Sequence, residues 1–156
     1  MSARGLCNRE LAYARELLAA GDSPALRSAV RLQLMSALRY FWQEIASSHG
    51  VVQLASFDNL PQLRSVLQQK LGQEHPIAEL NQMEESPLIA QLLRLCDPAD
   101  VLSQTPDISH KISKSNIIKT SQDTESTAIM DVGFERNLLE FLQNVVIEWR
   151  EYSQEY

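Results

Sequence analysis

The residues of this chain that could bind a charged ligand gather near the start of its second predicted helix. Arg27 and Arg31 stand one helical turn apart in segment 24–48 and fall within the apolar arc of that helix. A guanidinium in a core needs a partner, because an unpaired buried charge costs several kcal/mol. Two interpretations follow. Either both arginines reach water or pair with Glu10 or Glu16, or they form an anion or phosphate pocket between the first two helices.

Other groups with catalytic potential lack the spacing that chemistry requires. His49, His75 and His110 fall in predicted helix ends or loops and lack a complete set of partners at metal-ligand spacing, so we expect surface histidines and no metal site. No arginine stands four to seven residues before a histidine, which removes the acid–base pair of small helical ribonuclease toxins. Glycine-rich phosphate loops and G-x-S-x-G turns are missing too. The sequence therefore favours a protein without catalytic activity and without a cofactor.

Composition predicts one domain over residues 1–156. The chain has 44% hydrophobic residues, enough for a sizeable core, and a formal net charge of −6, which disfavours nucleic acid as a partner. Cys7 and Cys96 lie in apolar helical contexts without C-x-x-C spacing, so we expect buried thiols. Neither a membrane-spanning apolar run nor an apolar signal core is visible, and we expect a cytoplasmic protein without membrane contact.

Glycine and proline stand at the borders of segments with helical apolar spacing, which predicts an all-α protein. Ser23–Pro24 and Ser86–Pro87 each combine an N-cap with a proline at the first helical position. The expected helices cover about 6–20, 24–48, a segment opened by Asp58 and Pro61 and stopped by Gly72, a brief one from Pro76, one from Pro87 to about Asp97, and about twenty residues after Gly133.

The second helix should be central, because it is apolar over most of its circumference. Its apolar arc contains Val30, Leu34, Leu38, Phe41 and Ile45, flanked by Leu26, Met35 and Trp42. We therefore expect an up-and-down bundle of four to six helices, in which the last helix docks along the second. The stripe of that last helix comprises Phe134, Leu138, Phe141, Leu142, Val145, Trp149 and Tyr152.

A polar segment, 103–132, separates the last helix from the others. Ser, Thr, Asp and Lys dominate it and the helical period disappears. Because unstructured connections of this length are uncommon in compact domains, we expect a mobile insertion or a functional loop. Its β-branched residues leave a short strand or hairpin as the alternative.

The first two helices resemble a known family. Asn8 to Arg15, Leu17–Leu18, and the run from Ala29 through Ala46 are similar to small gammaproteobacterial helical proteins catalogued as a domain of unknown function. The resemblance implies a helical fold and a cytoplasmic bacterial protein, and it supplies no activity. This chain departs from the family at Ser28 and Gln33, where an acid and a histidine are common.

These patterns favour a non-enzymatic protein that acts through a protein partner or as a homodimer. Tyr40 on the polar strip of the second helix and Tyr152 near the C-terminus are candidates for the partner surface, because aromatic residues are enriched at interface hot spots. The alternative is a bundle that binds a small molecule or nucleotide anion through Arg27 and Arg31.

Overall fold

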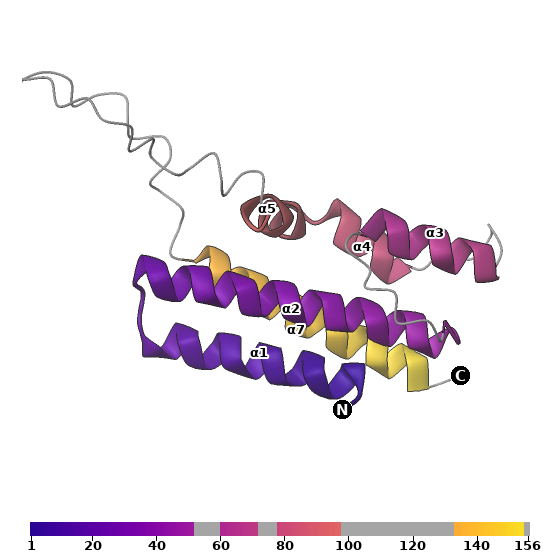
Figure 1. Cartoon of the computed structure of the whole chain (residues 1–156), viewed down its shortest axis with the longest axis horizontal. Coiled ribbons are helices and arrows are strands. Elements are labelled where there is room, and N and C mark those ends of the chain that lie inside the picture. The colour runs from indigo at the N-terminus through magenta and orange to yellow at the C-terminus, as the bar shows by residue number, and fades with distance from the viewer. Residues whose placement is uncertain (52–59, 72–77, 98–132, 155–156) are drawn as a thin grey trace, which may run out of the picture.

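The computed structural model describes residues 1–51, 60–71, 78–97 and 133–154, and within these ranges it contains six helices and no strand. The expected all-α bundle is therefore confirmed. Figure 1 shows α2 and α7 in the middle, with α1 on one side and α3, α4 and α5 on the other. His75, His110 and segment 103–132, for which the sequence makes predictions, lie outside the described residues.

Helices α1 (Ala3–Ala20) and α2 (Pro24–Ser48) form an antiparallel hairpin. The bounds of α2 agree with the prediction, and Ser23 Oγ accepts a hydrogen bond from Leu26 N at 3.2 Å. Helix α1 begins three residues earlier than expected, because Ser2 Oγ caps it by accepting from Gly5 N at 3.2 Å. Gly5 consequently lies inside the first turn of α1, whereas the sequence pattern predicted that the helix begins after it.

The turn between these helices depends on Gly21. Its φ is +151°, in a region that side chains rarely adopt, and a Cβ added there would approach Leu26 Cδ1 at 3.3 Å. Because only residues 21–23 separate the two helices, α1 folds back directly onto α2.

Helix α2 is buried on opposite sides, as its wide apolar arc predicts. All five residues of the arc are at most 1% exposed, and Trp42 is fully buried as well. Cys7, Leu11 and Ala14 of α1 contribute to the same core. Helix α2 is therefore the element on which the other layers are built.

Helix α7 (Phe134–Gln154) runs alongside α2 in the same direction (Figure 1). Its buried stripe includes Leu138, Leu142, Val145 and Trp149, and the Trp149 ring meets the Phe41 ring edge-on at a centroid distance of 5.5 Å. The expected docking along the second helix is confirmed. At the two ends of the predicted stripe, Phe134 is buried and Tyr152 is 66% exposed.

The remaining layer consists of short helices: α3 (Leu60–Leu71), α4 (Ala78–Glu85) and α5 (Pro87–Leu95). Buried leucines and Met83 pack this layer against the centre. Arg64 of α3 joins it to α4 by hydrogen bonds to Glu84 and Asn81. The predicted Ser86 cap is present, with Ser86 Oγ accepting from Ile89 N at 3.5 Å.

Substitution of two leucines of α2, one buried and one exposed, tests whether this helix lies at the centre of the bundle. Leu34 is fully buried and Leu32 is 61% exposed on the same helix. We expect Leu34→Ala to lower the free energy of unfolding by about 3 kcal/mol, from lost transfer energy and a cavity, and Leu32→Ala by less than about 0.5 kcal/mol. Urea denaturation measures both, and equal effects would contradict the burial of α2.

Candidate functional site

Arg31 is held by the first turn of α7. Its Nε donates to Glu135 Oε1 at 2.8 Å, and a second guanidinium nitrogen lies 2.8 Å from the same oxygen. The Glu135 side chain is 1% exposed and that of Arg31 is 19% exposed, so this ion pair between residues 104 positions apart is largely buried. The carboxylate also lies in the first turn of α7, where the helix dipole stabilises negative charge.

Arg27 lies at the same end of the bundle and contacts the turn between α1 and α2. Its Nε is 2.7 Å from Asp22 Oδ1, and Asp22 is half exposed. The sequence predicts that both arginines reach water or pair with Glu10 or Glu16. The pairing is wrong, because Arg27 meets Asp22, Arg31 meets Glu135, and Glu10 pairs with Arg9 at 2.7 Å. The Arg27 and Arg31 side chains are 24% and 19% exposed, as expected of residues within the apolar arc near the end of the bundle. Their proposed role in ligand binding stays a prediction.

Arg150 joins three helices at the opposite end of the bundle. It donates to both carboxylate oxygens of Glu44 at 2.9 and 2.7 Å, and to Asn8 Oδ1 at 2.8 Å. Only 13% of the Arg150 side chain and 11% of the Glu44 side chain are exposed. A bidentate pair of this kind fixes orientation as well as distance, so it sets the position of α7 on α2.

Cys7 lies beside this clamp and is fully buried, as predicted. Burial raises the pKa of its thiol from 9.0 to about 12, although the nearby Arg150 guanidinium acts in the opposite direction. A thiol held in its protonated form is a poor nucleophile. Cys96, expected to be buried, is only half-buried, and burial also raises its pKa.

A groove runs between α1 and α7 and consists of three adjoining hollows of about 350, 420 and 210 Å³. The first is bordered by Asn8, Leu11, Asn144, Val146, Ile147 and Arg150, and shares Arg15 and Gln143 with the second. The second adds Leu139 and Glu140, and shares Leu18, Ala19 and Arg136 with the third. The third also touches Gly21, Asp22, Arg27 and Glu135. We call these hollows together the α1–α7 groove.

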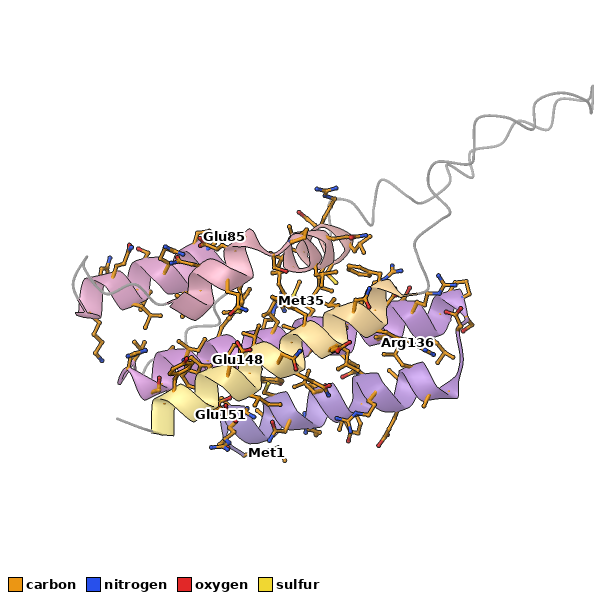
Figure 2. The ribbon with its side chains drawn as sticks, turned by 180° about the vertical axis from the view of Figure 1, so that it is seen from behind. Met1, Met35, Glu85, Arg136, Glu148 and Glu151 are labelled. Atoms are coloured by element: carbon orange, nitrogen blue, oxygen red, sulfur yellow. The ribbon has the colours of Figure 1, made fainter. Side chains whose placement is uncertain are left out.

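Two arginines in the middle of the α1–α7 groove have no partner within the described part of the chain. Arg15 from α1 and Arg136 from α7 border the same hollow, and neither forms a hydrogen bond or ion pair with another described residue. Figure 2 shows Arg136 on the side of α7 that faces the end of α1. Sequence reasoning missed both residues, because the face they share forms only when α1 and α7 lie side by side.

The tyrosines proposed for a partner surface lie outside the α1–α7 groove. Tyr40 is half-buried and packs against the core, whereas Tyr152 is exposed near the end of α7. Neither borders any of the three hollows. The structure therefore does not bring the two together, and their role stays a prediction.

Among the residues that the structure describes, no group of three or more His, Cys, Asp or Glu side chains could hold a metal ion, and His49 is half-buried at the end of α2. None of the described helices is both long and apolar enough to cross a bilayer.

Comparisons with protein-family models, with curated proteins and with solved structures found no match to this chain. The α1–α7 groove must therefore be interpreted from its own geometry.

The Arg150 clamp yields a stability prediction. Arg150→Met leaves the Glu44 carboxylate nearly buried without its partner, and we expect a loss of about 3 kcal/mol in the free energy of unfolding. Adding Glu44→Met should recover a large part of that loss, because no unpaired charge then remains. Arg94→Met, an exposed change on α5, serves as the control. Additive losses in the double variant, measured by urea denaturation, would contradict the clamp.

Cys7 yields a pH prediction. Because its folded pKa is raised, its contribution to stability is complete below pH 9 and is lost as pH rises from about 9 toward 12. Between pH 8 and 10 we expect the wild type to lose about 1 kcal/mol more than Cys7→Ala does. Urea titrations at both pH values measure the difference. Identical losses in both proteins would contradict a raised pKa, as would alkylation of Cys7 before Cys96 in the folded chain.

Proposed function

We propose that this chain is a non-enzymatic binding module of the bacterial cytoplasm, which acts by contacting another protein or a second copy of itself. The α1–α7 groove carries the proposal. It extends along two helices and combines apolar side chains with exposed polar groups, and protein interfaces contain both kinds of surface.

Ile147 is the strongest support for a protein as the occupant. It is 54% exposed and borders the groove together with the buried Leu11 and Val146. A partner that covers this surface would remove apolar area from water, which contributes about 25 cal/mol of favourable free energy per Å². The amides of Asn144 and Gln143 stand next to it and offer hydrogen bonds that could orient the occupant.

The alternative, an anion site at Arg27 and Arg31, gains no support from the hollow beside them. Asp22 and Glu135 engage the two guanidiniums and border the same hollow as Arg27. An incoming phosphate would have to displace these carboxylates or lie against them, and both events are unfavourable. We therefore prefer the protein-binding role.

The bacterial and cytoplasmic parts of the proposal rest on the sequence. The resemblance to the gammaproteobacterial family is inferred from segments that lie in α1 and α2, and it supplies no activity. The Cys7 thiol is fully buried and out of reach of a substrate, which is consistent with a role that uses no nucleophile.

Photo-crosslinking tests the proposed surface. A photoreactive amino acid is placed at position 147 in the groove and, as a matched control, at the exposed Gln68 on α3. Both proteins are produced in bacterial cells and irradiated. We expect position 147 to give discrete adducts, at the mass of a dimer for self-association or at another defined mass for a partner, and position 68 to give none. Adducts at neither position, or the same adducts at both, would contradict the proposal.

A further inference from the structure

We infer that the α1–α7 groove accepts an amphipathic helix of a partner protein whose carboxylates lie between Arg15 and Arg136. This inference rests on the proposed function and names the chemistry of the partner. Arg15 stands on one wall of the central hollow and Arg136 on the other, so both can reach a ligand placed between the helices.

The charge of the central hollow differs in sign from that of the chain. The whole protein carries −6, yet this hollow has two guanidiniums against a single carboxylate, Glu140. Glu140 follows Arg136 by one turn but forms no ion pair with it in the described structure. Because charges are screened beyond about 8 Å at physiological salt, a bound segment responds to this local excess more than to the net charge.

The walls of the groove favour a helix as the occupant. Both walls are helices whose backbone groups are bonded within the helix, so no sheet edge is available for a strand to extend. The three hollows have no aromatic side chain on their borders, whereas polyproline segments dock in aromatic grooves. A helix can place an apolar stripe against Leu11, Val146 and Ile147 and direct acidic residues toward the arginines.

The length of the groove sets the length of the occupant. On α7 it extends from Glu135 to Arg150, which at 1.5 Å per residue is about 22 Å. A matching helix needs about 15 residues. Its carboxylates should lie near its middle, because Arg15 and Arg136 both border the second, central hollow, whereas Arg150 in the first hollow is already engaged by Glu44.

Peptide display provides the test. A random library of about 16-residue peptides is selected against the purified full chain. We expect the enriched peptides to carry at least two acidic residues and apolar residues at helical spacing. One enriched peptide is then synthesised, and its affinity is measured by fluorescence anisotropy against wild type and variants.

We expect the variants to change the peptide affinity in opposite directions, and a general loss of structure would not do this. Arg15→Gln with Arg136→Gln should weaken binding about tenfold or more, and Glu140→Gln should strengthen it by about twofold to threefold. Arg94→Gln on α5, an exposed arginine away from the groove, should change affinity less than about twofold. The three arginines and Glu140 are all exposed, so we expect these variants to fold.

Ile147→Asp separates failure of this inference from failure of the proposed function. If Ile147→Asp removes binding of an enriched neutral or basic peptide while the arginine variants do not matter, the groove binds proteins and the acidic helix is wrong. If no peptide is enriched and position 147 gives no crosslinked adduct, both proposals fail. If inorganic phosphate instead raises the melting temperature through Arg15 and Arg136 and no peptide is enriched, the site binds small anions and the inference is overturned.

Discussion

Two largely buried ion pairs between α2 and α7 determine how the last helix lies on the bundle. Arg31 meets Glu135 at one end, and Glu44 meets Arg150 at the other. The paired residues are thirteen positions apart on α2 and fifteen on α7, which correspond to about 20 and 22 Å along the two helix axes. Because these two distances nearly match, both ion pairs can form when the helices lie parallel. A shift of α7 by one turn would leave Glu135 buried without a partner, at a cost of several kcal/mol.

The apolar contacts supply most of the stabilisation, and the ion pairs select one arrangement among those that the contacts allow. Leucine and valine stripes can interlock in more than one register with similar burial, whereas a bidentate arginine–carboxylate pair has a single favourable geometry. The edge-on contact of Phe41 with Trp149 lies between the ion pairs and adds a further geometric restraint. Once α7 is fixed, its outer face and that of α1 form the two walls of the groove.

Local sequence signals predicted the helices well because the forces that start and stop a helix act within a few residues. Ser23–Pro24 and Ser86–Pro87 each gave a helix start, and the apolar arc of α2 gave the central core. The cap at Ser2 was missed, since Gly5 suggested a border where the structure continues the helix. These elements needed no knowledge of the tertiary arrangement.

The partners of the arginines could not be found in the same way. The inward phase of Arg31 was visible on a helical wheel, but Glu135 stands 104 residues away and no local pattern links them. The available signal was the carboxylate of Glu135 in the first turn of the last helix. It does not identify a partner for Arg31, because carboxylates are also common in the first turn of exposed helices. The groove depends on the relative rotation of α1 and α7, which is set by packing against α2 and not by either sequence alone.

The distribution of partners among the arginines separates structural cations from those available to a ligand. Arg31 and Arg150 would have to break buried pairs with Glu135 and Glu44 before contacting a ligand, so their use in binding would destabilise the bundle. Arg15 and Arg136 are exposed and make no ion pair in the described structure, and they can gain a partner without losing one. Their separation across one hollow then favours a ligand that presents carboxylates to both walls at once, since each pair alone contributes at most about 1 kcal/mol. In the proposed complex, an apolar helix face against Ile147 would supply the additional binding energy that these exposed pairs lack.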